Sequence, residues 1–203
     1  RRINPNCRIP AMVDREGPGG APVNVFETGA MLLYLADQAG GNKLVPPAAT
    51  KQRVECLNWL FWQVSGMGAY FAQYAHFLAR DAANKAAVEA GKEPAVHPSA
   101  VAYGVQRYGE EARRLLSVLE LHLKEDLTGG RREYIVDGAG YTIADIAACP
   151  FVMMFTEGAF GKITGIDAKA DYPFVHKWAH RCSSRPAYQA GLQVASKDPI
   201  SKL

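Results

Sequence analysis

Apolar residues recur at helical spacing along most of the chain from Thr28 onward. This pattern predicts one helix that starts at Thr28 and ends at Gly40-Gly41, because glycine readily terminates a helix. Further helices are predicted over 51–80, 99–126, 142–155, 172–183 and 186–195. Residues 81–98 are rich in Ala, Lys and Glu and contain two prolines, which predicts a mobile surface connection with or without helical turns.

The start of the chain follows a different pattern. Residues 8–14 are typical of a short strand, the Gly/Pro-rich stretch 17–22 of a turn, and Val23 to Phe26 of a second strand. A two-stranded hairpin is marginally stable by itself. We therefore expect the first half of an α/β domain to lie upstream of Arg1.

These elements predict a chain of the α/β plus all-α class. Residues 1–41 form the ββα end of an α/β domain, residues 42–50 with Pro46-Pro47 form a linker, and residues 51–203 form an all-helical domain. Within the helical domain, Trp59, Phe61 and Phe71 are predicted core residues. The pair Thr142 and Asp145 predicts a capping box at the start of a buried helix.

Composition and charge exclude several classes of protein. The net charge is +3 from 23 basic and 20 acidic residues with the two signs interspersed, which argues against a nucleic-acid surface. No run of eighteen apolar residues is present, so we expect no membrane span. The four cysteines are far apart and form no C-x-x-C pair, which favours a reducing, cytoplasmic compartment over a disulfide or zinc framework.

Two short segments could carry chemistry. Pro10 stands near the start of a strand; it is either an ordinary edge-strand proline or, with a cis bond before it, a turn that presents the Ile9 backbone to an extended peptide. Glu27 and Thr28 stand where a strand passes directly into a helix. Thr28 either only caps this helix or, with the free N–H groups, binds a carboxylate while Glu27 binds an ammonium.

Three sequence runs together resemble the glutathione transferase superfamily over nearly the whole chain. They are N-P-x-x-x-I-P-A-x-V-D from Asn4, F-E-[ST]-G-A-x-x-x-Y-L from Phe26 and Y-[ST]-I-A-D-I-A from Tyr141. Residues 58–68 resemble the Nu-class branch, which includes bacterial disulfide-bond oxidoreductases. The resemblance implies a thioredoxin-like domain before the helical domain, glutathione as substrate or co-substrate without a metal, and a homodimer.

The resemblance also assigns roles to individual residues. Ile9, before a cis-Pro10, would pair its backbone with the cysteinyl part of glutathione, and Arg8 would reach the glycyl carboxylate. Glu27 and Thr28 would hold the γ-glutamyl ammonium and carboxylate. Asn6 is a weaker candidate, and Cys7 is only a neighbour. The hydroxyl or amide donor that activates the thiol is expected upstream of Arg1.

The implied function is that of an enzyme in which the glutathione thiolate is the nucleophile. It would either conjugate glutathione to a small electrophile or reduce small disulfides and peroxides, and the Nu-class resemblance favours reduction. The alternative is a binding or scaffold protein of the same fold without turnover. The intact Ile9-Pro10 and Glu27-Thr28 elements favour the enzyme.

Other candidates are weaker. Tyr70, Gln73 and Tyr74 lie on the helix that borders the co-substrate cavity in this family. Arg107, Arg113 and Arg114 could assist a second glutathione, although exposed helix arginines are far commoner. His176 and His180 have the spacing of two metal ligands on a helix, but without an evident third ligand a solvated helix face is the better interpretation, so no metal is predicted.

Overall fold

The computed structural model describes residues 2–40, 42–125, 129–158 and 160–197. The end of the expected hairpin domain at residue 41 and the last residues of the expected helical domain, 198–203, lie outside these ranges. The elements are β1 (Ala11–Asp14), a short turn η1 (Pro18–Gly20), β2 (Val23–Phe26), α1 (Thr28–Ala39), α2 (Lys51–Trp62), a π-helical turn η2 (Gln63–Met67), α3 (Gly68–Glu89), α4 (Pro98–Lys124), α5 (Ile143–Thr156), α6 (Gly161–Thr164), α7 (Ala168–Asp171), α8 (Pro173–Ser183) and α9 (Pro186–Lys197).

The ββα part consists of the predicted hairpin and its following helix. Within the described residues the sheet has two strands, β1 and β2, paired antiparallel with Ala11 opposite Phe26. The strand predicted over 8–14 begins only at Ala11. Pro10 has no N–H to donate, and the carbonyl of Arg8 accepts a side-chain hydrogen bond from Asn4 at 2.6 Å instead of joining a ladder.

A hydrogen bond fastens α1 to the hairpin. The Tyr34 hydroxyl donates to Oδ2 of Asp14 at 2.6 Å. This bond lowers the pKa of the Asp14 carboxyl and raises the pKa of Tyr34. It fixes the orientation of α1 relative to β1, and therefore where the N-terminus of α1 points.

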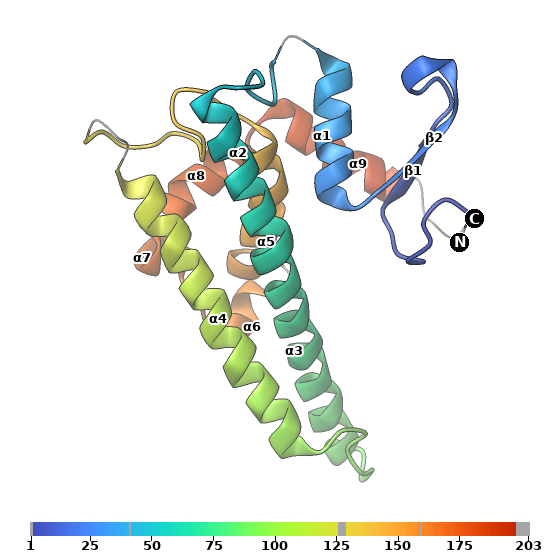
Figure 1. Cartoon of the computed structure of the whole chain (residues 1–203). Helices are drawn as coiled ribbons and strands as arrows, with labels where there is room; N and C mark the ends of the chain where they lie inside the picture. The colour runs from blue at the N-terminus through green and yellow to red at the C-terminus, as the bar shows by residue number, and fades with distance from the viewer. Residues whose placement is uncertain (1, 41, 126–128, 159, 198–203) are drawn as a thin grey trace.

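The helical part is organised around two long helices and one buried helix. α3 and α4 pack side by side, and α5 packs against α1, α2, η2 and α8 (Figure 1). The largest fully buried side chains include Leu60, Phe71, Leu115, Phe155 and Trp178. α5 is apolar around nearly its whole circumference, as expected for a helix enclosed by others.

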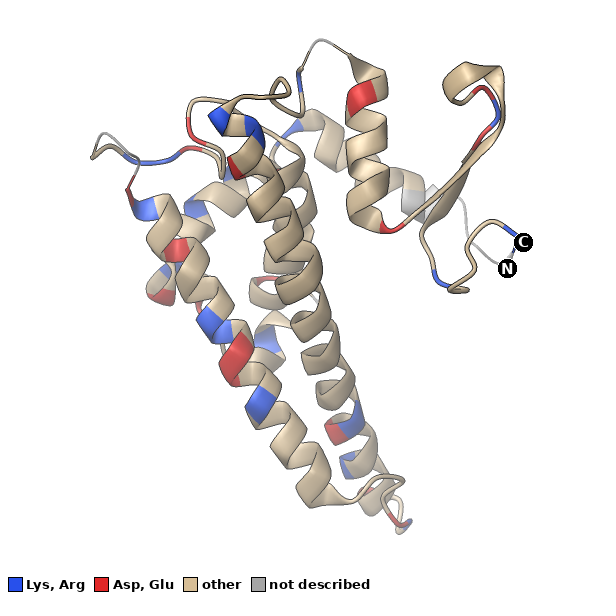
Figure 2. Cartoon of the chain, in the orientation of Figure 1, with Lys and Arg blue, Asp and Glu red and all other residues tan. Residues whose placement is uncertain are grey.

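Apart from the buried Asp145, the charged residues of the described chain lie outside this core. Figure 2 shows basic and acidic residues interspersed along α4 rather than gathered by sign. In the described part of the chain, no helix is both long enough and apolar enough to cross a membrane.

The structure differs from the prediction for residues 51–98 in two respects. α3 continues through residues 81–89, which were predicted to belong to a surface connection because prolines follow them. Their Ala-rich sequence favours a helix. The buried Asn84 also holds the following loop, because its side chain donates a hydrogen bond to the Val96 carbonyl at 2.7 Å. The helical stretch predicted over 51–80 consists of α2, the π-helical turn η2 and the first part of α3. The short helices α6 and α7 were not predicted, because four residues show no periodicity.

The predicted core residue Phe61 is on the surface. Its side chain is 60% exposed, whereas Phe71 is fully buried and Trp59 is half-buried against the core. The inward face of α2 is set by Cys56 and Leu60, both fully buried. Phe61 follows Leu60 by one residue, about 100° around the helix, and therefore points away from the core.

The capping box at the start of α5 is present as predicted. The Asp145 carboxylate accepts from the Thr142 N–H at 2.8 Å and from its hydroxyl at 3.1 Å. It also accepts from the Ile135 N–H at 2.9 Å and from Nε1 of Trp178 at 2.8 Å. Burial raises the pKa of Asp145, and these hydrogen bonds act in the opposite direction. One buried carboxylate thus joins a loop and two helices.

Replacing Thr142 by Ala should lower the free energy of unfolding by about 1–2 kcal/mol, because it removes the cap of α5 and a donor to Asp145. Chemical denaturation followed by circular dichroism measures the difference. Thr142→Ser keeps the hydroxyl and is the matched control. Equal losses in the two variants would show that the hydroxyl is not the stabilising group.

A second polar cluster lies near the C-terminal end of α4 and links it to α2 and to the loop before α5. Nε2 of His122 bonds to the Ile135 carbonyl at 2.7 Å, and its ring lies 4.1 Å from that of Trp59. Glu55 lies 3.8 Å from the same nitrogen and pairs with Arg132 at 2.9 Å. Burial lowers the pKa of His122.

This lowered pKa makes stability depend on pH. Since the pKa of folded His122 lies below the ordinary value of 6.5, the unfolded chain takes up the proton first as the pH falls. The stability that neutral His122 contributes to the folded state is fully present above pH 6.5 and is lost as the pH falls through the pKa of the folded state. Between about pH 7.5 and about pH 5.5 the free energy of unfolding should therefore fall more steeply for the wild type than for His122→Gln. His76→Gln, at an exposed position of α3, should keep the wild-type slope; a wild-type slope in His122→Gln would contradict the assignment.

Candidate functional site

A hollow of about 200 Å³ lies between the loop that precedes β1 and the N-terminus of α1. It is lined by Asn4, Asn6, Arg8, Ile9, Pro10, Glu27 and Thr28. Six of these are the residues to which the sequence assigned glutathione; the seventh, Asn4, was not assigned. Two segments separated by the whole hairpin thus meet at one surface (Figure 1).

Asn4 determines the shape of the loop. It is 7% exposed, its amide donates to the Arg8 carbonyl at 2.6 Å, and its Oδ1 accepts from the Asn6 N–H at 2.9 Å. The Cys7 N–H donates to the Asn4 carbonyl at 3.0 Å. The sequence signal for Asn4 was its place at the head of the first motif, but its structural role depends on carbonyls and N–H groups that no motif describes.

Ile9 and Pro10 line the hollow directly before the start of β1. The Ile9–Pro10 peptide bond is cis and Ile9 is 86% exposed. Pro10 precedes β1 and lies outside its ladder, and the cis bond is the form that the resemblance implies. Cys7, with φ of 53°, is exposed, and its Sγ lies 3.8 Å from the Pro5 carbonyl, so it neighbours the hollow without lining it.

The opposite side of the hollow is the start of α1. Glu27 is the N-cap residue, with φ 69° and ψ 120°, and among the described residues its side chain makes no capping hydrogen bond. Positive φ at a residue other than glycine costs about 1–3 kcal/mol and persists mainly where function or surrounding structure requires it. Thr28 is the first helical residue rather than the N-cap, so the interpretation of Thr28 as a mere cap does not fit this geometry.

The N-terminus of α1 is suited to an anion. The first intrahelical hydrogen bond runs from the Met31 N–H to the Glu27 carbonyl at 2.9 Å. The N–H groups of residues 28–30 precede this ladder and carry the positive end of the helix dipole. With the Glu27 carboxylate beside them and the Arg8 guanidinium across the loop, the hollow offers partners for a carboxylate, an ammonium and a second carboxylate.

The residues predicted for the co-substrate do not gather in the same way. Tyr74 is 4% exposed and its ring stacks on Phe155 at 5.9 Å, so it belongs to the core. Tyr70 is half-buried beside Tyr108, whereas Gln73 is exposed. The three side chains lie within about one turn of α3 but differ in burial, and helical spacing alone could not predict which of them the neighbouring helices cover.

Two of the three arginines of α4 have partners nearby. Arg113 donates to the Thr164 carbonyl at 2.8 Å, which ties α4 to α6. Arg114 pairs with Glu111 on its own helix at 2.7 Å. Arg107 is exposed on the same helix.

Comparison with known proteins decides the family. The family described as glutathione S-transferase, C-terminal domain, matches residues 83–186. The disulfide-bond oxidoreductase YfcG of Escherichia coli K12 is 39% identical over 195 residues, covering 96% of this chain and 75% of that protein. This chain belongs to the glutathione transferase family. The ββα part and the helical part are accordingly those of a thioredoxin-like domain and its helical partner, the fold that the motifs predicted.

Further relatives of this transferase-family chain agree. The disulfide-bond oxidoreductase YghU of Escherichia coli K12 is 32% identical, and the match covers 95% of this chain and 57% of that protein. A Pseudomonas fluorescens family member solved with two glutathione molecules has a TM-score of 0.72 at 36% identity, covering 94% of this chain and 73% of that one. A Pseudomonas putida glutathione transferase solved with glutathione disulfide has a TM-score of 0.73 at 30% identity, covering 95% and 72%.

Proposed function

We propose that this glutathione transferase family protein binds glutathione in the hollow and uses its thiol to reduce small disulfides or peroxides, or to conjugate small electrophiles. Disulfide reduction is the preferred activity, because two relatives are named disulfide-bond oxidoreductases. The observation that carries the proposal is the meeting of Arg8, Ile9, Glu27 and Thr28 at one surface. Reduction of one disulfide would convert two glutathione thiols into glutathione disulfide.

Each end of glutathione has a complementary group in the hollow. The γ-glutamyl carboxylate would bind the Thr28 hydroxyl and the N–H groups of α1, while its ammonium would bind the Glu27 carboxylate. The backbone of Ile9 would pair with the cysteinyl part, and Arg8 would bind the glycyl carboxylate. We assign recognition of the tripeptide to these residues and thiol activation to none of them.

The compartment, the oligomeric state and the domain bounds are also proposals. We propose a cytoplasmic homodimer whose hairpin domain ends at residue 41 and whose helical domain begins at residue 51. The intervening residues 42–50, all of them described, contain neither helix nor strand. The interspersed charges give no reason to add nucleic acid to the proposed partners.

Glu27→Ala and Thr28→Ala should each weaken glutathione binding by about 1–3 kcal/mol, because each removes a charge-assisted hydrogen bond. Isothermal titration calorimetry measures the change. Glu27→Gln retains the shape of the side chain without its charge, and Glu16→Gln removes an exposed carboxylate of the same hairpin that does not line the hollow. Affinity that is unchanged in Glu27→Gln, or lowered equally in Glu16→Gln, would show that Glu27 does not hold the ammonium.

Turnover separates an enzyme from a scaffold. The protein should be retained on immobilised glutathione and should reduce hydroxyethyl disulfide faster than it conjugates chlorodinitrobenzene. Cys7→Ser should leave the reductase rate unchanged, because the nucleophile is the thiol of glutathione. Retention without turnover in either assay would support the non-catalytic alternative, and loss of both would reject the glutathione site.

A further inference from the structure

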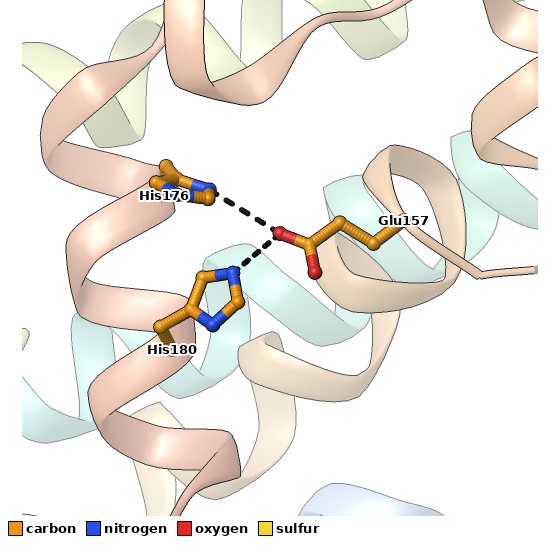
Figure 3. Close-up of side chains that lie close together, drawn as sticks. All are labelled: Glu157, His176 and His180. Carbon is orange, nitrogen blue, oxygen red and sulfur yellow. Dashed lines mark hydrogen bonds and ion pairs between the residues drawn. The ribbon is translucent and has the colours of Figure 1, made fainter.

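Two histidines of α8 and one glutamate of α5 form a compact cluster. His176 and His180 lie one turn apart on α8, and Glu157 is the C-cap residue of α5. Oε1 of Glu157 lies 3.2 Å from Nδ1 of His176 and 2.6 Å from Nε2 of His180, and all three side chains point toward one another (Figure 3). The candidate ligand atoms all lie within 4.8 Å of one another.

The packing of α5 against α8 supplies the third candidate ligand, which was not evident in the sequence. The spacing of the two histidines predicts that they share a helix face, but no third ligand follows them in the sequence. Glu157 belongs to another helix, and only the tertiary fold places its carboxylate between the two imidazoles. The cluster therefore has the ligand set of two histidines and one glutamate, which zinc enzymes use while a fourth position stays open.

The Nδ1 atom of His176 is buried and, among the described residues, has no hydrogen-bond partner. Its 3.2 Å distance to Glu157 is short enough for a hydrogen bond, so the direction must be unsuitable. A metal ligand shows this combination, because its lone pair points at the ion rather than at the neighbouring ligand. Nε2 of His180 does share a hydrogen bond with Oε1 of Glu157 at 2.6 Å, and a bound ion would replace that bond. An unpaired buried nitrogen is otherwise costly.

The surroundings of the cluster favour a cation. Glu157 stands at the C-terminal end of α5 and His180 in the last turn of α8, where the helix dipoles are negative. The neighbouring basic residues of α8 have partners elsewhere: Nζ of Lys177 lies over the Phe174 ring at 6.0 Å, and Arg181 donates to the Glu133 carbonyl at 2.6 Å.

We propose that Glu157, His176 and His180 bind one divalent transition-metal ion of the Zn²⁺ class. Imidazole ligands select such ions over Mg²⁺ and Ca²⁺. Bonds of about 2.0–2.1 Å in a tetrahedral site separate ligand atoms by roughly 3.3 Å. The His176–Glu157 distance already fits. Oε1 of Glu157 and Nε2 of His180 need to separate by roughly 0.7 Å, and the side chains are 35% and 49% exposed.

The bound ion would link the C-terminal end of α5 to α8. The site shares no residue with the hollow beside α1, so the two proposed sites are separate. Its fourth position, on the exposed side of His180, would hold water.

Titration of chelator-treated, untagged protein with Zn²⁺ tests the site by calorimetry. All variants carry Cys7→Ser, which removes the one exposed thiol among the four cysteines as a competing ligand. The Cys7→Ser protein should bind one Zn²⁺ per chain. Loss of a ligand should weaken Zn²⁺ binding by more than about tenfold in His176→Ala, His180→Ala and Glu157→Gln. Even residues that only hydrogen-bond to a metal ligand change the affinity by about tenfold or more when they are replaced. His76→Ala, an exposed histidine of α3, is the matched control and should bind as tightly as its parent.

Two further readouts keep binding separate from folding. Metal-free variants should have the circular dichroism spectrum of the metal-free parent, and Zn²⁺ should raise the Tm of the parent but not of Glu157→Gln. If His176→Ala fails to fold, Glu157→Gln still tests the site, because that carboxylate is partly exposed. The absence of saturable Zn²⁺ binding in the Cys7→Ser protein, or equal binding by the three ligand variants and His76→Ala, would overturn the proposal.

Discussion

The helical part of this protein depends on one buried carboxylate. Asp145 accepts hydrogen bonds from Thr142 at the start of α5, from the Ile135 N–H in the preceding loop and from Trp178 on α8. Because the group is buried, each lost donor would leave part of a charge unsatisfied in an apolar surrounding. The same interaction therefore fixes where α5 begins and how α8 lies across it.

The position of α5 determines that of the hollow beside the N-terminus of α1. α1 packs against α5, and the Ile143 N–H at the start of α5 donates to the Leu44 carbonyl of the connecting segment at 2.8 Å. Gly29 comes so close to the Val64 side chain that a Cβ there would lie 3.0 Å from it. The α1 N-terminus is thus held between the hairpin and the helical part, which explains how a surface hollow can present oriented N–H groups.

The two proposed sites use helix ends of opposite polarity. The hollow uses the N-terminus of α1, where free N–H groups suit a carboxylate, and the Glu157–His176–His180 cluster uses C-terminal ends, where carbonyl dipoles suit a cation. In both cases, side chains from a second segment complete the set of ligands. The loop that contains Arg8 does so at the hollow, and the end of α5 does so beside α8.

The sequence by itself determined the hairpin, most of the helices, the capping box and six of the residues that line the hollow, because each is written in local spacing or in a short motif. Only the tertiary structure decided which face of each helix is buried. Phe61 is exposed and Tyr74 buried, although both lie on predicted helices, since neighbouring helices and the π-helical turn choose the inward side. Asn4 and Glu157 were overlooked for the same reason: their partners are backbone atoms or side chains on other segments, and packing brings those together without leaving a periodic signal.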